Sequence, residues 1–162
     1  MLKQNPARRT DTDQSAGYSD EKAFVDELTR LIKGTDALFS CSHATHEFRH
    51  SSGRADIVAR SSTGELIAFE AKLTKWRDAL HQAYRNSSFA HYSYVVLPMK
   101  AAHTAIRNRR EFEIRGVGLC AVDDGPVTIE IAARRNEPLL PWITEAAISK
   151  LVNSGSPCNT AA

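Results

Sequence analysis

The chain has 162 residues, of which 42% are apolar and 25% are charged, and it contains 8 glycines and 6 prolines. This composition is typical of one globular domain and excludes a collagen, a long coiled coil and a wholly disordered chain. The apolar runs reach only four or five residues, whereas a membrane-spanning helix needs about 18 to 20. No apolar segment follows the basic residues near the start, as a secretory signal would require. We therefore expect a cytoplasmic protein that does not enter a membrane.

Lysine and arginine outnumber aspartate and glutamate by 21 to 19, which gives a net charge of +2. Such a charge neither requires nor excludes a nucleic acid as partner. Two groups of basic residues, Arg107 with Arg109 and Arg110, and Arg134 with Arg135, either bind phosphate groups or face solvent. The three cysteines lack the CxxC spacing of a zinc site and are expected to stay reduced.

The ends of the chain differ in composition from its middle. Residues 1–18 and 154–162 are polar and lack apolar periodicity, so we expect two flexible tails. Residues 19–153 contain the apolar patterns, and no linker rich in proline or serine divides them. They therefore predict one domain.

The domain is predicted to begin with a helix over about 20–33. Asp20 is a good N-cap residue, apolar residues recur at helical spacing from Phe24 to Ile32, and Gly34 ends the pattern. Beyond it, periodicity predicts strands at 44–50, 55–60 and 65–73, a helix at 75–89, a strand at 92–97, a helix at 100–112, strands at 117–122 and 127–133, and a helix at 141–152. The order αβββαβ, followed by further helices and strands, predicts an α/β fold with a mixed central sheet flanked by helices.

Three ionisable residues interrupt the apolar strands at 55–60 and 65–73. Side chains alternate along a strand, so Glu70 and Lys72 share one face, and hairpin pairing brings Asp56 beside Glu70. Two adjacent carboxylates repel each other unless a cation lies between them, and such oxygen ligands suit Mg²⁺. Lys72 would then lie where it can orient a water molecule or stabilise phosphoryl charge.

This pattern resembles the signature of the PD-(D/E)XK nuclease superfamily, which has the restriction-endonuclease-like fold. That signature is an acid, a variable gap and then acid-x-Lys on the next strand; here it reads Asp56 and Glu70-Ala71-Lys72, with Ala55 in place of the usual proline. The family's αβββαβ core also matches the elements expected over residues 21–97. The resemblance implies cleavage of DNA with Mg²⁺, for which Mn²⁺ substitutes, and metal ligation by Asp56, Glu70 and the Ala71 carbonyl.

The resemblance also directs attention to residues around the motif. Related nucleases carry an acid on the first helix, and Glu21 lies in the apolar sector of that helix; it is either a further metal ligand or a favourable acid in a first turn. Gln82 resembles a glutamine that some family branches carry after the motif, and it would position DNA or water; its alternative is an exposed helical residue. Arg54 and Arg85 either contact phosphates or are solvated.

Simpler interpretations of these residues are less consistent with the sequence. A buried ion-pair network without catalysis would leave Asp56, Glu70 and Lys72 with a surplus negative charge that burial penalises. A zinc site formed by the three histidines between 43 and 50 would lack a fourth ligand. Trp76 and Tyr84 favour core packing over base stacking.

The sequence therefore predicts a Mg²⁺-dependent phosphodiesterase that cleaves DNA, an endonuclease of the PD-(D/E)XK class. The alternative is a non-catalytic nucleic-acid-binding module of the same fold that acts with a partner, which the arginines at 107–110 would serve. A third hypothesis is cleavage of RNA. A homodimer is expected from the resemblance alone.

Overall fold

The computed structural model describes residues 17–34, 39–154 and 156–158, with no side-chain description at 154 and 156. The predicted tail at 1–16 therefore lies outside the described residues. The helices are α1 (Glu21–Lys33), α2 (Trp76–Asn86), α3 (Met99–Ile106), α4 (Arg109–Arg115) and α5 (Pro141–Ser154); the strands are β1 (Cys41–His50), β2 (Gly53–Ser61), β3 (Leu66–Ala71), β4 (Tyr92–Pro98), β5 (Gly118–Val122), β6 (Val127–Ile131) and β7 (Ser156–Pro157). No helix within these ranges has the length and apolarity needed to cross a bilayer.

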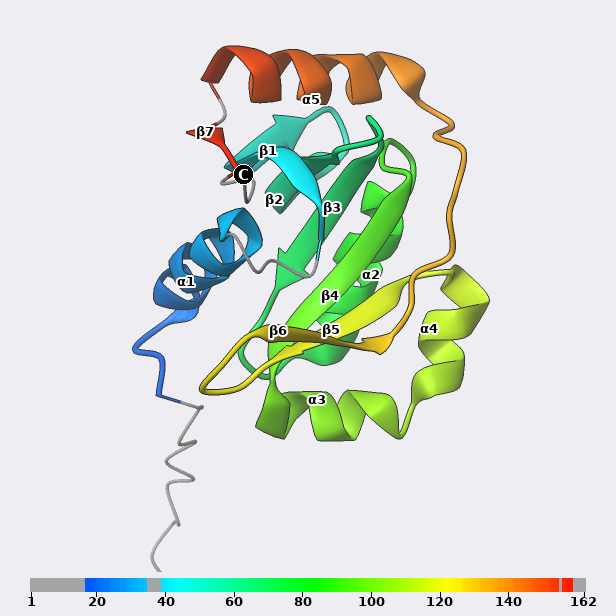
Figure 1. The fold of residues 1–162 in the computed structure, drawn as a ribbon. Helices are drawn as coiled ribbons and strands as arrows, with labels where there is room; N and C mark the ends of the chain where they lie inside the picture. Colours follow the sequence, from blue (N-terminus) through cyan, green and yellow to red (C-terminus); the bar gives the residue numbers. More distant parts are fainter. Residues whose placement is uncertain (1–16, 35–38, 155, 159–162) are drawn as a thin grey trace, which may run out of the picture.

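The strands form one mixed sheet in the order β6-β5-β4-β3-β2-β1-β7 (Figure 1). The pairs β1–β2 and β2–β3 are antiparallel, as in a meander, whereas β4 pairs in parallel with both β3 and β5. The segment from α1 to β4 has the order αβββαβ. The predicted α/β fold with a mixed, helix-flanked sheet is confirmed.

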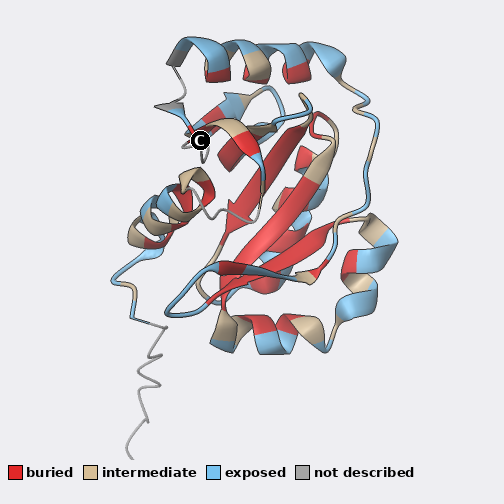
Figure 2. Cartoon of the chain, viewed as in Figure 1, coloured by how far each residue is buried: buried red, intermediate tan, exposed pale blue. Residues whose placement is uncertain are grey.

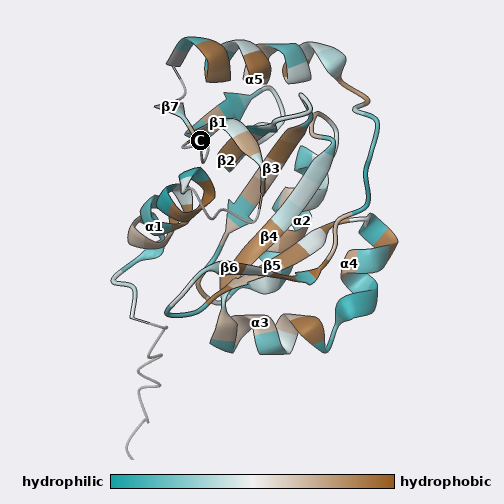
Figure 3. Cartoon of the chain, in the orientation of Figure 1, coloured by the Kyte–Doolittle hydropathy of each residue, from teal (hydrophilic) through white to brown (hydrophobic). Residues whose placement is uncertain are grey.

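Helices cover both faces of the sheet, and the apolar core is divided between those faces. Phe24, Leu28 and Ile32 of α1 pack against Phe69 and other residues on one face. On the opposite face, α2 packs over β3 and β4, α3 packs over β4 and β5, and α5 packs over β1 and β2. The buried residues accordingly concentrate in the central strands (Figure 2), where hydrophobic residues also gather (Figure 3).

Helix α1 begins as its sequence predicts. The carboxylate of Asp20 accepts a hydrogen bond from the Ala23 backbone N–H at 2.8 Å, and Gly34 follows the last turn. Tyr18, which the sequence analysis placed in a flexible tail, packs its ring against Phe24 with a centroid separation of 4.8 Å. Tyr18 therefore belongs to the packed domain, although it precedes the predicted boundary.

The prediction of one continuous helix over 100–112 is wrong, because the structure has two helices there, α3 and α4. The Asn108 side chain donates a hydrogen bond to the Thr104 carbonyl at 3.0 Å, and its backbone N–H donates to the Ala105 carbonyl at 2.9 Å. An asparagine that bonds the preceding turn in this way competes with helix continuation. The chain turns at Asn108, and α4 then buries Phe112.

Two other expectations differ from the structure. Tyr84 was predicted to lie on the buried face of α2, but it is 54% exposed, because at about 100° per residue it lies to one side of the stripe formed by Trp76, Leu80 and Ala83. Within the segment 154–162, predicted as a tail, Ser156 and Pro157 pair with β1 and Cys158 is buried. The C-terminal segment thus joins the sheet at this point.

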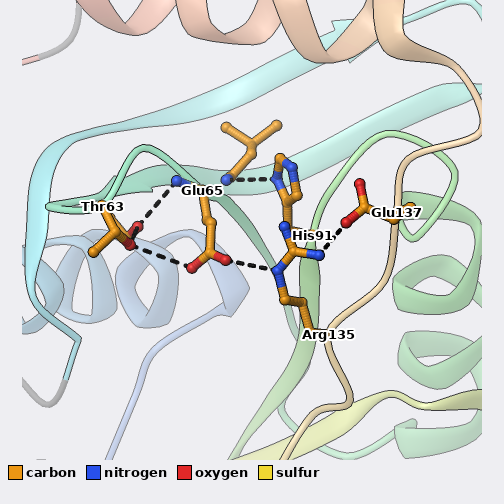
Figure 4. Close-up of polar contacts among 7 residues, drawn as sticks. Thr63, Glu65, His91, Arg135 and Glu137 are labelled. Atoms are coloured by element: carbon orange, nitrogen blue, oxygen red, sulfur yellow. Dashed lines mark hydrogen bonds and ion pairs between the residues drawn. The ribbon is translucent and has the colours of Figure 1, made fainter.

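A polar network fastens the connection between β6 and α5 to the turn between β2 and β3 (Figure 4). The Arg135 guanidinium donates to the Glu65 carboxylate at 2.7 Å and also pairs with Glu137. Thr63 donates to Glu65 at 3.3 Å, and the His91 ring accepts from the Leu66 backbone N–H at 2.9 Å. The returning segment is therefore fixed in place before α5 begins.

Candidate active site

The pairing of β2 with β3 brings two carboxylates together. The antiparallel register places Ile57 opposite Phe69, and one position further along each strand lie Asp56 and Glu70. Side-chain alternation directs both residues away from Ile57 and Phe69, which belong to the cluster under α1. The predicted proximity of Asp56 and Glu70 thus follows from the ladder itself.

The ladder between β2 and β3 ends at this point. The Ala71 backbone N–H donates a hydrogen bond to the Asp56 carboxylate at 3.0 Å instead of to a backbone carbonyl of β2. Asp56 is 7% exposed, and this bond fixes one of its oxygens. The other oxygen faces Arg54, whose guanidinium lies 3.4 Å away.

Arg54 is shared between two carboxylates. Besides Asp56, it lies 3.6 Å from the carboxylate of Glu47, a residue with the left-handed backbone conformation φ 55°. The Lys150 ammonium donates to the Glu47 carbonyl at 2.8 Å and so supports this conformation from α5. A non-glycine residue held with positive φ beside a site is strained, and such strain is common at functional positions. Arg54 therefore lies between the carboxylates of Glu47 and Asp56.

Glu70 is the most enclosed charged group of the site. It is 2% exposed, and its carboxylate accepts a hydrogen bond from the Asn86 side-chain amide of α2 at 3.2 Å. Burial, and then the negative charge of Asp56, raise the pKa of Glu70 to about 8, which the Asn86 bond and the Lys72 charge only partly oppose. Without a cation, one proton therefore remains on this carboxyl near neutral pH.

Lys72 follows the end of β3 and extends toward α1. Its ammonium donates a hydrogen bond to the Glu21 carboxylate at 3.0 Å, and its side chain is 21% exposed. Another acid of α1, Glu27, pairs instead with Arg30 at 2.6 Å. The structure thus brings Glu21 to the site, as the geometry of α1 predicts, but pairs its carboxylate with the lysine.

Two adjoining cavities open over these residues and share Glu21. One, of about 440 Å³, is lined by Asp56, Ala71 and Arg54 among others. The other, of about 640 Å³, is lined by Lys72, Gln82 and Arg85. The side-chain oxygen of Gln82 is buried and has no hydrogen-bond partner among the described residues. The predicted site residues therefore line these two cavities, except for Glu70, which lies buried beside Asp56 and lines neither.

The donor set suits a hard cation bound by few protein ligands. No group of three or more histidine, cysteine, aspartate or glutamate side chains with metal-binding geometry occurs in the described part of the chain. Asp56 and Glu70 nevertheless supply a repelling pair of carboxylates, and Mg²⁺ commonly binds through one or two carboxylates while it keeps several waters. The residues present fit such an ion.

The three histidines of β1 do not form a zinc site. The His43 ring lies 3.2 Å from the Ser42 hydroxyl, whereas His46 lines the cavity beside Asp56. The His50 ring packs against Phe89 with a centroid separation of 4.7 Å. The three rings have separate surroundings.

Asn86 is a site residue that the sequence analysis missed. It lies on the buried face of α2, where Ala79 and Ala83 also lie, and it is 2% exposed. A lone polar residue on an apolar helical stripe is a detectable signal, because a buried amide needs a hydrogen-bonding partner. That Glu70 is this partner could not be predicted, because the contact depends on how α2 packs over β3, and local sequence patterns do not determine that packing.

No protein-family model matches this sequence, and no curated protein matches it. Among solved structures, the chain is similar to a protein of unknown function from Silicibacter pomeroyi, with a TM-score of 0.53 and 16% identity, covering 67% of this chain and 70% of that chain. It is also similar to a repair endonuclease from Pyrococcus abyssi, with a TM-score of 0.46 and 16% identity, covering 67% of this chain and 49% of that chain. At such identity, the first similarity concerns the fold alone and agrees with the α/β architecture.

Proposed function

We propose that this chain is a metal-dependent phosphodiesterase that cleaves DNA as an endonuclease. The observation that carries the proposal is the pair Asp56 and Glu70, two enclosed carboxylates on neighbouring strands, one of which has a pKa raised to about 8. A structural ion pair between Asp56 and Arg54 has no need of a second acid in this position, and burial opposes the ionisation of that acid. A pair of carboxylates beside a lysine is instead suited to phosphoryl chemistry.

Asp56, Glu70 and the carbonyl oxygen of Ala71 would hold Mg²⁺, with Mn²⁺ as a substitute, since both ions prefer oxygen ligands. When bound, the ion would neutralise the carboxylates and activate a water molecule for attack on phosphorus. The Asn86 amide orients Glu70 for this role through its 3.2 Å hydrogen bond. The Ala71 N–H does the same for Asp56.

Lys72 supplies positive charge at the rim of the same region. Its bond to Glu21 keeps the long side chain extended over the cavity, and an incoming phosphate group would compete with the Glu21 carboxylate for it. Gln82 and Arg85 line the same cavity and would contact the DNA backbone. Glu21 acts here as a positioning residue for Lys72, and direct metal ligation by Glu21 remains a separate proposal.

The test is cleavage of supercoiled, linear, branched and single-stranded DNA, with RNA in parallel, in Mg²⁺, Mn²⁺ or EDTA. We expect Asp56→Asn, Glu70→Gln and Lys72→Met each to reduce cleavage by at least about 100-fold, as loss of a group acting on the transition state does. Glu145→Gln is the matched control, because Glu145 is an exposed carboxylate on α5. Parent activity that survives in EDTA, or in all three variants, would contradict the proposal.

A non-catalytic DNA-binding module is the competing function. Of the arginines at 107–110 that motivate it, Arg109 is already engaged by Glu113 at 3.5 Å and by the Glu130 carbonyl at 3.0 Å. Salt-sensitive DNA binding that is indifferent to Mg²⁺ and to Glu70→Gln, without cleavage of any substrate, would favour the module over the enzyme.

A further inference from the structure

A third cavity, of about 570 Å³, adjoins the candidate active site. Arg85 of α2 lines both this cavity and the one that contains Lys72, so the two cavities meet at this side chain. The remaining walls come from the turn after β1, from the end of α4 and from the segment between β6 and α5. The cavity thus depends on elements outside the αβββαβ core.

The cavity carries positive charge without a balancing acid. Three arginines line it, Arg85, Arg115 and Arg134, and none of its lining residues is an aspartate or glutamate. No ion pair to these three side chains occurs among the described residues. Arg115 donates to the Glu111 backbone carbonyl at 2.9 Å. A concave surface with this charge favours an anionic ligand.

The side chain of Arg134 lies against a glycine. Gly116 ends α4 with φ +69°, and a Cβ atom added there would lie 3.0 Å from a terminal nitrogen of the Arg134 guanidinium. The guanidinium therefore lies close over the Gly116 backbone, where any larger residue would displace it. The charge therefore lies at the cavity wall beside the end of α4.

The same cavity exposes an unusual amount of apolar side chain. Tyr84, Ile114 and Leu139 line it and are 54%, 65% and 80% exposed. In addition, the hydroxyl of Ser88, another lining residue, is buried without a hydrogen-bond partner in the described structure. Exposed apolar groups next to arginines and an unused hydroxyl match a ligand that has a flat apolar face, polar edges and negative charge.

We propose that this cavity binds an unpaired segment of the DNA substrate next to the cleaved bond. Arg134, Arg115 and Arg85 contact successive phosphates, and a base stacks on the Tyr84 ring. A fully paired duplex offers only its phosphates to such a surface and leaves the apolar wall uncovered, whereas an unpaired base can cover it. The inference rests on the proposed function and adds a preference for DNA with a single-stranded region.

The test is fluorescence anisotropy with a labelled single-stranded oligonucleotide and the matching duplex, in EDTA so that no cleavage occurs. For Arg134→Gln and Arg115→Gln, we expect affinity for the single strand to fall about 5- to 20-fold, and the slope of log K against log salt to become shallower by about 0.7. Tyr84→Ala should weaken binding about 5- to 100-fold and leave that slope unchanged, because stacking is not ionic.

Two controls keep the result specific. Lys100→Gln removes an exposed positive charge that does not line the cavity, and it should retain parent affinity. Arg134→Lys keeps the charge and should recover most of the salt slope. Circular dichroism and thermal melting establish that each variant is folded.

The outcomes separate this inference from the proposed function. If Glu70→Gln abolishes cleavage while the cavity variants bind single strands as the parent does, the cavity assignment is wrong and the enzyme stands. If the cavity variants lose binding but the parent cleaves no DNA, the cavity assignment stands and the enzyme is wrong. Equal loss of duplex and single-strand binding would overturn the preference for an unpaired segment.

Discussion

Glu70 makes the stability of the protein depend on pH. Its pKa rises from the ordinary 4.5 to about 8 in the folded chain, chiefly through burial and then through the charge of Asp56. The folded state consequently binds more protons than the unfolded state between these values, so stability is lost as pH rises from about 4.5 to about 8. Above about pH 8 the Glu70 carboxyl is ionised in the folded protein, and the whole unfavourable free energy of burying its charge then lowers the stability.

The variant Glu70→Gln should remove this cost. In EDTA we expect it to be more stable than the parent at pH 8.5, by on the order of a few kcal/mol, and the difference should shrink as the pH falls to 5. Urea denaturation at several pH values measures the free energy of unfolding of both proteins. A difference that stays constant with pH would show that Glu70 does not titrate in this range.

The acidic pair could be predicted because it depends on local rules. Strand alternation fixes the faces of Glu70 and Lys72, and a short turn fixes which residue of the preceding strand lies opposite. Asn86 and Glu47 could not be predicted, because their roles arise where α2 and α5 meet the sheet. Tyr84 was misplaced because several residues of α2 are small or polar, which leaves the edge of its buried stripe poorly defined.

The elements of the C-terminal half are joined by close backbone approaches. Gly118 opens β5 opposite Tyr94 of β4, and a Cβ atom there would lie 2.3 Å from the Tyr94 ring and 2.8 Å from the Ala133 backbone nitrogen. The Ala133 N–H in turn donates to the Tyr94 hydroxyl at 3.4 Å. This hydrogen bond restrains the Tyr94 ring, so the ring cannot easily move to make room for a side chain at position 118.

Gly118→Ala should therefore destabilise the protein by about 1–3 kcal/mol, the usual cost of inserting a methyl group into a well-packed core. Gly125→Ala is the control, because nothing lies within 4 Å of the added Cβ at the turn between β5 and β6. Thermal melting of the two variants beside the parent measures the difference. Equal melting temperatures would mean that Tyr94 can rotate out of the way.

Strands and most helices were predictable, whereas the interruption between α3 and α4 was not. Apolar residues recur at helical spacing on both sides of Asn108, with Ala105 before it and Phe112 after it. Periodicity therefore continues through the break. The hydrogen bonds of Asn108 determine where the helix breaks. The sequence does not reveal this, because asparagine occurs both at helix ends and on helix surfaces.

At the scale of the whole molecule, the αβββαβ segment depends on the helices and strands that come after it in the chain. Strand β4 lies in the middle of the sheet and pairs along its length with β5. Val95 and Leu97 of β4 are buried against Leu119 and Phe112 in the same cluster. The αβββαβ segment is thus not a complete structural unit by itself.

A fragment of residues 17–98 should consequently fail to fold cooperatively. It would expose one edge of β4 and the apolar cluster under α2, and exposed edges and patches of this kind promote association. Size-exclusion chromatography and thermal unfolding of the fragment, beside the full chain, measure the effect. A monomeric fragment with a sharp melting transition would contradict this dependence.

The short strand β7 has a consequence for how copies of the protein can meet. It forms the outermost position of the sheet beside β1, opposite His43 and Ala44, and one of its two residues is Pro157. Proline has no N–H to donate to a further strand, and a two-residue strand offers very little backbone to pair with. Joining of two molecules into one continuous sheet is therefore disfavoured where β7 lies, so at this position the fold resists edge-to-edge aggregation.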